Sequence, residues 1–292
     1  MGKYRGIIGW ICFIWVIYFV VSVLVGTNTK KVESEKELKV EVVVEYKYRR
    51  LCIPLEEYIK RLLPSTIDIH CEKEVLKAQA VILRSGIVYK AFQTKENNGH
   101  AVKKMQIMEK QLGYKSRGKD YFSKQWKKQS KEYFEKIQQA VDDTRGIVLI
   151  HEGQLIPGAF TRLSAMKTRE NVKMGYLKAV DCKQNIEEKN YLSYMDLDKD
   201  VHAKILQKDE AGYVDYVLVD GRIMKGDSFC KKYKLASTNF IINNHQVKCK
   251  GRGHGYGMDQ YFANQLVKNK TAKTYMDLMQ LFFEDISFEK YN

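Results

Sequence analysis

The sequence has little proline and no paired cysteines. Only 3 of its 292 residues are proline, so it holds no Pro-rich linker between separate domains. Its 6 cysteines form no C-x-x-C pair and no short Cys/His spacing, which speaks against a disulfide framework and against a zinc site. We expect mostly free thiols, with a single disulfide as the alternative. Acidic residues are also fewer than basic ones.

The excess of basic residues restricts the class of partner. Lys and Arg number 50 against 35 Asp and Glu, which gives a net charge of +15. A surface of this sign suits a polyanion, whether nucleic acid, anionic lipid or an anionic cell wall.

One long uncharged run lies near the N-terminus. Residues 7–25 read IIGWICFIWVIYFVVSVLV, long enough to cross a hydrocarbon core of roughly 30 Å. The alternative is a cleaved signal peptide, but no small-x-small site follows and the run exceeds the usual apolar core of such a peptide. We predict a cytoplasmic N-terminus at 1–6, a single-pass membrane anchor at 7–25, a linker at 26–39 and an extracytoplasmic domain at 40–292. A basic domain in that compartment makes nucleic acid an unsuitable partner and favours wall polymer or the membrane surface.

Strand and helix patterns alternate irregularly along the rest of the chain. The pattern predicts an α+β fold, with mixed helices and short antiparallel strands around one central buried helix at 72–92. Glu152-Gly153 and Asp220-Gly221 predict two hairpin turns. The other expected strands are 40–48 and 240–247; the other expected helices are 54–63, 121–141, 227–233, one after Met258, and 275–283; 94–119 is expected to be irregular.

A glycine-rich stretch, GRGHGYGMDQY at 251–261, is the first candidate site. It lacks the Gly-Lys-Ser/Thr ending of a phosphate-binding P-loop and the glycine spacing of a dinucleotide fingerprint. Its glycines can adopt positive φ and bring backbone N–H groups close to a ligand. His254 would then contact that ligand or carry a proton. The alternative is a tight structural turn in which His254 bonds to the backbone.

The helix at 72–92 is the second candidate. Glu74 lies in its first turn, on one line with short side chains that leave room for a ligand. The alternative is that Glu74 only complements the helix dipole. Gln79 and Arg84 are polar residues in an otherwise apolar helix, which makes them either structural partners or part of a site.

The same two segments resemble a known family. EVLKAQAVILRS, at 74–85, resembles the E-A-L-K-A-Q-A-x-A-A-R-T motif of the stage II sporulation protein D (SpoIID) family. GHGYGMDQYFAN, at 253–264, resembles that family's G-H-G-x-G-M-S-Q-Y-G-A motif. Two segments between them, AVDDTRGIVLIHEGQLIPGAF and DGRIMKGDSFCKKYKLASTNF, are also similar, so the resemblance covers roughly 40–283.

The resemblance implies a membrane-anchored lytic transglycosylase that cleaves MurNAc–GlcNAc strands of peptidoglycan to 1,6-anhydro ends during engulfment. Glu74 would be the catalytic acid, and the substrate's own C6 hydroxyl would attack, so that no second carboxylate is needed. The resemblance implies no cofactor and, because the Cys/His pair of some members is missing near KQLGY, no metal. The implied substrate contacts are Gln79, Arg84, Ser85, Ser164, Thr168, His254, Gln260 and Tyr261, with Gly253, Gly255 and Gly257 as a backbone loop.

The resemblance also implies partner proteins and a cellular location. These are a peptidoglycan amidase, a multispanning sporulation membrane protein and the mother cell's engulfing membrane. The alternative function is that of a non-catalytic wall-binding or amidase-activating protein, as in relatives called amidase enhancers.

Several positions depart from the family pattern. S-E-M-P before the helix appears as STID, at 65–68, and loses an acidic residue. Gly86 stands where the family has an aromatic residue after the Arg-Thr pair. FTRLSAMKT, at 160–168, lacks the family's glycine pair and carries Arg162 in place of a small polar residue. We expect these changes to alter glycan affinity and activity more than the fold.

Overall fold

The computed structural model describes residues 39–46, 48–94, 104–171 and 173–291. The predicted cytoplasmic N-terminus and anchor lie outside these residues. Within them, no helix has the length and hydropathy of a membrane span. Residues 39–291 form one compact unit, and its mixture of helices and short strands confirms the α+β prediction.

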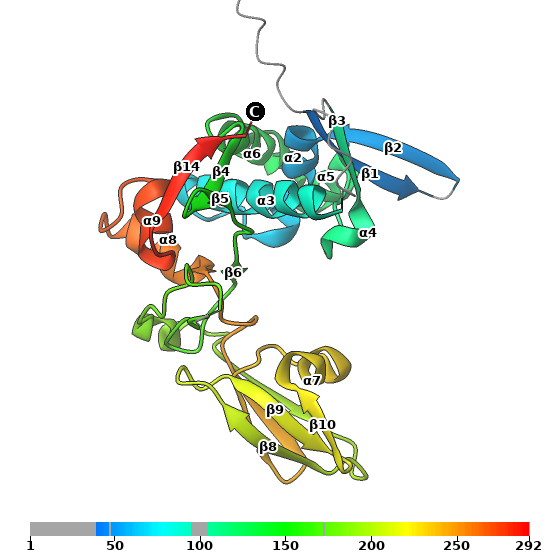
Figure 1. Cartoon of the computed structure of the whole chain (residues 1–292), viewed down its shortest axis with the longest axis vertical. Helices are drawn as coiled ribbons and strands as arrows, with labels where there is room; N and C mark the ends of the chain where they lie inside the picture. Colours follow the sequence, from blue (N-terminus) through cyan, green and yellow to red (C-terminus); the bar gives the residue numbers. More distant parts are fainter. Residues whose placement is uncertain (1–38, 47, 95–103, 172, 292) are drawn as a thin grey trace, which may run out of the picture. The chain divides into compact units, whose positions relative to one another are not determined.

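The helix α3 (Lys73–Gln93) is the centre of the helical part of this unit (Figure 1). It packs against α2 (Leu55–Thr66), α6 (Ser130–Asp142), α8 (Gln260–Lys268) and α9 (Tyr275–Phe282). Its side chains are buried on most sides, as the all-round apolar pattern predicts.

Two small sheets flank these helices. In the first, β1 (Lys39–Tyr46) pairs antiparallel with β2 (Arg49–Pro54) and parallel with β3 (Lys104–Met108). In the second, β4 (Ile147–His151) lies between β5 (Gln154–Leu155) and β14 (Ile286–Lys290). The predicted turn joins β4 to β5, with φ of 49° at Glu152 and 72° at Gly153.

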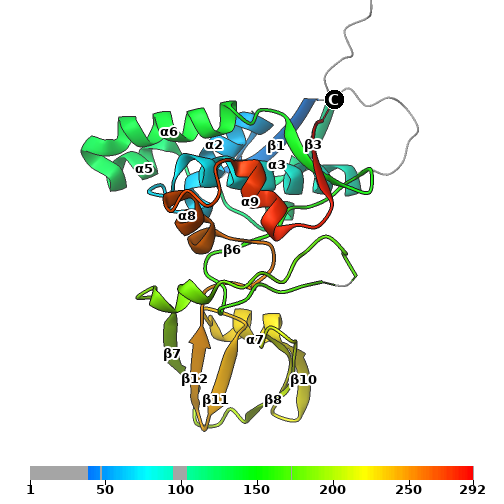
Figure 2. The ribbon, with the colours of Figure 1, turned by 90° about the vertical axis from the view of Figure 1, so that its left-hand side faces the viewer.

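A β part with its own core is built from the middle of the chain (Figure 2). One sheet holds β8 (Ala203–Lys208), β9 (Val214–Val219) and β10 (Arg222–Lys225), and another holds β7 (Leu192–Asp196), β12 (Gln246–Lys250) and β11 (Phe240–Asn243). Helix α7 (Gly226–Tyr233) contributes Phe229, which stacks on Phe240 at 5.4 Å between ring centroids.

Two short parallel strands connect the helical part with the β part. β6 (Phe160–Thr161) pairs with β13 (Met258–Asp259). Between β6 and β7 the chain is mostly irregular, with one 3₁₀ turn, η2 (Lys183–Glu187). The candidate glycine stretch immediately precedes β13, so it lies where the chain passes from the β part to the helical part.

Three predicted elements differ from the structure. The helix expected at 121–141 is broken into α5 (Lys119–Trp126), η1 (Lys127–Gln129) and α6, because Lys127 adopts φ of 50°. The segment expected to be irregular at 94–119 contains β3 and α4 (Glu109–Leu112). The strand expected at 240–247 is a hairpin, since Asn244 turns the chain at φ of 54°.

The five cysteines in the described part of the chain are free thiols. Cys52 is exposed and the other four are buried. This agrees with the expectation of mostly free thiols and leaves no disulfide among these residues.

Candidate functional site

The glycine stretch is packed tightly against the protein's own chain. Gly251, Gly253, Gly255 and Gly257 all adopt positive φ, between 72° and 108°. A Cβ on Gly257 would lie 2.1 Å from the carbonyl oxygen of Ala159, and one on Gly255 would lie 2.3 Å from the Tyr213 ring. Glycine is therefore required at these positions because the loop runs against β6 and Tyr213.

Three glycine N–H groups of this loop donate hydrogen bonds inside the protein. Gly251 N–H donates to Tyr191 O at 2.7 Å and Gly253 N–H to Ala236 O at 2.8 Å. Gly255 N–H donates to the Thr161 hydroxyl at 3.2 Å. We expected Gly253, Gly255 and Gly257 to bring the backbone close to sugar hydroxyls. In the structure their close approach is to the protein itself, and the loop forms the floor of a site.

Three neighbouring cavities lie along this floor and share lining residues. The first, of about 470 Å³, lies between the α2–α3 connection and α8. It shares Arg162 and Arg252 with the second, of about 550 Å³, which in turn shares Ala159, Gly253 and His254 with the third, of about 610 Å³. We call this row of cavities the groove.

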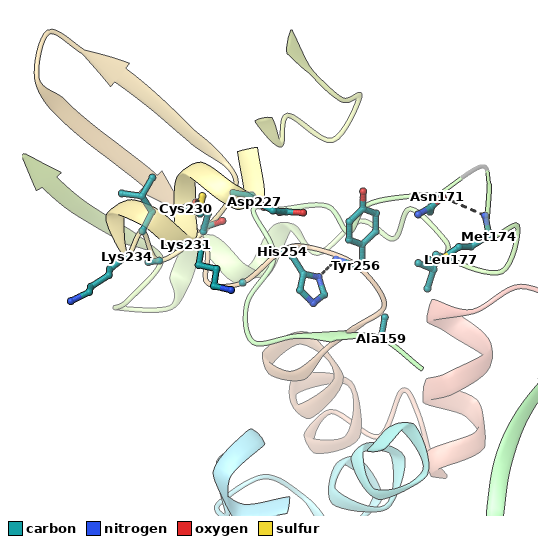
Figure 3. Close-up of a pocket in the computed structure, with 15 residues that line it drawn as sticks. Ala159, Asn171, Met174, Leu177, Asp227, Cys230, Lys231, Lys234, His254 and Tyr256 are labelled. Carbon is teal, nitrogen blue, oxygen red and sulfur yellow. Dashed lines mark hydrogen bonds between the residues drawn. The ribbon is translucent and has the colours of Figure 1, made fainter. Parts of the chain in front are cut away.

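The third cavity has an apolar wall and a polar rim (Figure 3). Ala159, Met174 and Leu177 line one side, while Lys231 and His254 line another. An elongated cavity with separate apolar and cationic walls suits a ligand that has both kinds of surface.

Two guanidinium groups supply the positive charge at the middle of the groove. Arg162 is exposed and Arg252 half-buried, and each lines both the first and the second cavity. Within the described part of the chain, neither has a carboxylate within ion-pair distance. Arg162 is a departure from the family pattern, so this charge is a property of this chain.

His254 presents one ring nitrogen to the groove. Its Nδ1 accepts the N–H of Tyr256 at 3.1 Å, which leaves the proton of the neutral ring on Nε2. The side chain is exposed at the groove surface, but protein atoms surround it on the other sides, and this desolvation lowers the pKa of His254. At neutral pH the ring is therefore an uncharged donor, suited to a hydroxyl or carbonyl of a ligand.

Tyr256, beside His254, is held in place by a buried arginine that the sequence did not single out. Arg169 lies over the Tyr256 ring at 4.3 Å and over the Tyr213 ring at 5.2 Å. It also pairs with Asp209 at 2.5 Å and Asp215 at 2.8 Å. Because these partners lie far apart in the sequence, no local pattern could have identified Arg169.

Asp68, one of the two carboxylates that line the first cavity, is not poised to donate a proton. Asp68 accepts from the backbone and ring of His70, at 3.0 and 2.7 Å. Burial by itself would raise the pKa of Asp68, but these hydrogen bonds hold it below its ordinary value. A general acid requires the opposite shift.

Gln79 and Gln260 meet beneath the first cavity. The Gln260 amide donates to Gln79 Oε1 at 3.0 Å and to Thr66 O at 2.9 Å. Gln79 is fully buried, and its own amide nitrogen has no partner in the described structure. This pair fixes the end of α2 and the start of α8, so Gln79 positions the cavity wall instead of contacting a ligand as we predicted.

Arg84 and Ser85, two further predicted contacts, are also structural. Arg84 is fully buried and makes a two-point ion pair with Glu56, at 2.8 and 2.7 Å. The Ser85 hydroxyl donates to Val81 O at 2.8 Å and accepts the Leu149 N–H at 2.9 Å. Both side chains hold α3 against its neighbours and present no polar atom to a ligand.

Ser164 and Thr168 are both buried, and Ser164 belongs to a hydrogen-bond network around Asp259. The Asp259 carboxylate accepts from Ser164 N at 2.5 Å and from Asn185 Nδ2 at 2.7 Å. The Thr168 hydroxyl donates to Lys178 O at 2.8 Å. These two predicted contacts are therefore inside the protein. Asp259 was missed, although an aspartate just before a helix is a common N-cap, and here it accepts the Phe262 N–H at 2.9 Å.

Glu74, the predicted catalytic acid, lies outside the three cavities. One oxygen accepts the Tyr275 N–H at 2.8 Å and the other contacts Lys77 Nζ at 2.8 Å, and the side chain is 23% exposed. Of the predicted contacts, His254, Gln260 and Tyr261 do line the groove. Within the described residues, no group of three or more His, Cys, Asp or Glu side chains could hold a metal ion.

Comparisons with known proteins agree with the motifs. A family model described as SpoIID, Stage II sporulation protein, matches residues 50–151. The chain is 24% identical to Stage II sporulation protein D of Bacillus amyloliquefaciens, over 82% of this chain and 75% of that protein. It is 27% identical to the protein of the same name from Bacillus subtilis (strain 168), over 80% of this chain and 73% of that protein. An uncharacterized protein of Brachyspira hyodysenteriae is 27% identical over 82% of this chain and 67% of that protein.

Proposed function

We propose, for a chain whose residues 50–151 carry the SpoIID family domain, a function on the bacterial cell wall during sporulation, in which the groove binds a glycan strand of peptidoglycan. The single observation that carries this proposal is the set of three cavities that share lining residues, with Arg162 and Arg252 common to the first and the second. A polymer of repeating units needs an extended site, and peptidoglycan carries carboxylates that guanidinium groups bind in a forked geometry.

The geometry supports binding of the strand better than its cleavage. A lytic transglycosylase needs a protonated carboxyl next to the scissile bond. Both oxygens of Glu74 accept hydrogen bonds within the protein, and the side chain lies outside the groove. The family's acidic position before the helix is Thr66 here, and its hydroxyl donates to Leu63 O at 2.9 Å. We therefore propose that the protein binds the cell wall without cleaving it and there activates a peptidoglycan amidase.

Cleavage is the second candidate function, because the Glu74 carboxylate is 23% exposed and is therefore not closed off from solvent. In that case Glu74, which the family resemblance implies as the acid, would have to leave Lys77 and turn toward the strand.

Digestion of purified peptidoglycan separates the two functions. We expect the full-length chain to bind sacculi and to release no 1,6-anhydro-muropeptides in a mass spectrum of the products. The Glu74→Gln variant should bind equally, because Glu74 is not part of the groove. Glu72→Gln is the matched control on the neighbouring turn. Release of anhydro products by the wild-type chain and by Glu72→Gln, but not by Glu74→Gln, would establish cleavage instead.

Removal of the groove's positive charge should weaken binding of the strand. We expect the Arg162→Ala, Arg252→Ala double variant to lose about tenfold or more in affinity for sacculi, since a charge-assisted hydrogen bond contributes roughly 1.5–3 kcal/mol. The measurement is a pull-down isotherm with purified sacculi. Arg61→Ala with Arg222→Ala is the matched control, since both side chains are exposed and outside the groove. Equal losses in the two double variants would show that overall charge, and not the groove, retains the wall.

The proposed location and partners follow from the same family membership. We propose that residues 7–25 anchor the chain in the engulfing membrane with the groove facing the wall. An amidase and a multispanning sporulation membrane protein are the proposed partners there. Co-purification from membranes of sporulating cells tests this part.

A further inference from the structure

A strongly basic surface lies on the residues just before α5, on α5 and η1, and on the start of α6, and its basic side chains are not among those that line the groove. We call residues 115–136 the basic hairpin. From 115 to 131 it contains seven Lys or Arg residues and one acidic residue, Asp120. All seven basic side chains are exposed. In the described structure only Lys131 has an acidic partner, Glu135 at 4.0 Å. The seven are Lys115, Arg117, Lys119, Lys124, Lys127, Lys128 and Lys131.

Aromatic rings accompany these charges. Trp126 is half-buried, stacks on Phe122 at 4.8 Å and meets Phe134 at 5.1 Å. Tyr121 is 42% exposed, and the Arg117 guanidinium lies 4.7 Å from its ring centre. Exposed cations beside Trp and Tyr rings are typical of protein surfaces that lie in the headgroup region of a bilayer.

The docking rests on the proposed membrane anchor at residues 7–25. Thirteen residues, 26–38, lie between the uncharged run at 7–25 and Lys39, the first described residue. Thirteen extended residues span at most roughly 45 Å. Lys39 begins β1, which packs against α2, and Lys60 of α2 pairs with Asp142 of α6 at 3.2 Å. The basic hairpin therefore belongs to the same packed helical part that starts at the tether.

We propose that the basic hairpin docks on anionic phospholipid headgroups of the membrane next to the tether. The attraction of several lysines to an anionic leaflet adds up, but it acts only within a Debye length of about 8 Å at physiological salt. The Trp and Tyr rings beside these lysines suit the interfacial region of a bilayer, and a wall polymer would not require them. This docking is independent of what the groove binds.

Fluorescence of Trp126 tests the docking directly. The chain has 3 tryptophans, of which Trp10 and Trp15 lie in the apolar run. In a Trp10→Phe, Trp15→Phe background, the full-length chain is reconstituted into vesicles that contain brominated phosphatidylcholine, with or without phosphatidylglycerol. We expect quenching of Trp126 to be at least about twofold stronger with phosphatidylglycerol and to fall to the neutral-lipid level at about 1 M salt, where the Debye length is about 3 Å.

Charge reversal supplies the decisive variants. Lys124→Glu, Lys127→Glu, Lys128→Glu and Lys131→Glu together should reduce quenching in phosphatidylglycerol vesicles to the neutral-lipid level. The matched control reverses four exposed lysines elsewhere, Lys189, Lys199, Lys204 and Lys232, and should keep the quenching. Both variants should unfold at the wild-type temperature, since all eight side chains are exposed.

Three results would overturn the proposal. The first is equal quenching in neutral and anionic vesicles, and the second is an equal loss in both fourfold variants. The third is quenching at the neutral-lipid level combined with binding to immobilised poly(glycerol phosphate) by the wild-type chain but not by the hairpin variant. That last result would assign the hairpin to an anionic wall polymer instead of the membrane.

Discussion

Replacement of Arg84 by methionine is expected to lower the free energy of unfolding by roughly 3–5 kcal/mol, the cost of leaving a buried charge without its partner. The Arg84 side chain is completely buried, and Glu56, its partner, is 9% exposed. The guanidinium also donates to Ile147 O at 3.1 Å. Its removal would leave the Glu56 carboxylate inside the helical part, with only the Gly146 N–H, at 3.1 Å, as a further donor. Urea unfolding followed by far-UV circular dichroism measures the change.

Two further variants make this prediction specific. Arg145→Met removes an arginine whose ion pair with Asp142, at 2.7 Å, is 55% exposed on the Arg145 side, so we expect a loss under about 1 kcal/mol. The double variant Arg84→Met, Glu56→Met removes both buried charges and should recover most of the lost stability. A double variant as unstable as Arg84→Met would mean that Arg84 acts through packing and backbone contacts and not through its ion pair.

Replacement of Gly257 by alanine is expected to cost about 2–5 kcal/mol. Its φ of 72° lies in the left-handed region, which costs about 1–2 kcal/mol for a residue with a side chain. The new Cβ would also lie 2.1 Å from a backbone oxygen, that of Ala159. Overpacking of this kind costs typically about 1–3 kcal/mol. Because Ala159 is followed directly by β6, neither chain can move without disturbing the groove floor. Thermal unfolding should therefore occur several degrees lower.

Gly153→Ala is the matched control for this prediction. Gly153 has the same φ of 72°, but nothing lies within 4 Å of the position of its Cβ. We expect only the conformational cost there, of about 1–2 kcal/mol. If the two variants lost equal stability, the close approach of the loop to β6 would contribute nothing, and the glycines would be needed for their conformation alone.

The regular elements with strong local signals could be predicted. The all-round apolar pattern of 72–92 identified α3, and the Glu-Gly and Asp-Gly pairs identified the β4–β5 and β9–β10 turns. Each depends on residues within one turn or one helix. The break at Lys127 could not be predicted in this way. The rings of Trp126 and Tyr133, 5.4 Å apart, join α5 to α6 across the break, and this contact exists only once the chain has folded back.

Several predicted contacts of the candidate site are buried in the structure, because the sequence does not give the direction of polar side chains. Sequence patterns singled out α3 and the glycine stretch, which meet through Gln79 and Gln260, but they could not distinguish a ligand contact from an internal one. Arg84 has its partner 28 positions away and Gln79 has its partner 181 positions away. A buried polar group is stable only where such a partner meets it.

The sequence by itself determined the α+β class, the central helix and the two hairpin turns, because these depend on short-range patterns and on backbone conformation; it also carried the motifs that resemble the SpoIID family. Only the tertiary structure decided that Gln79, Arg84, Ser164 and Thr168 turn inward, and that Arg162, Arg252 and His254 line the groove. The physical reason is that burial is a property of packed neighbours, and these neighbours are brought together only when distant segments of the chain fold against one another.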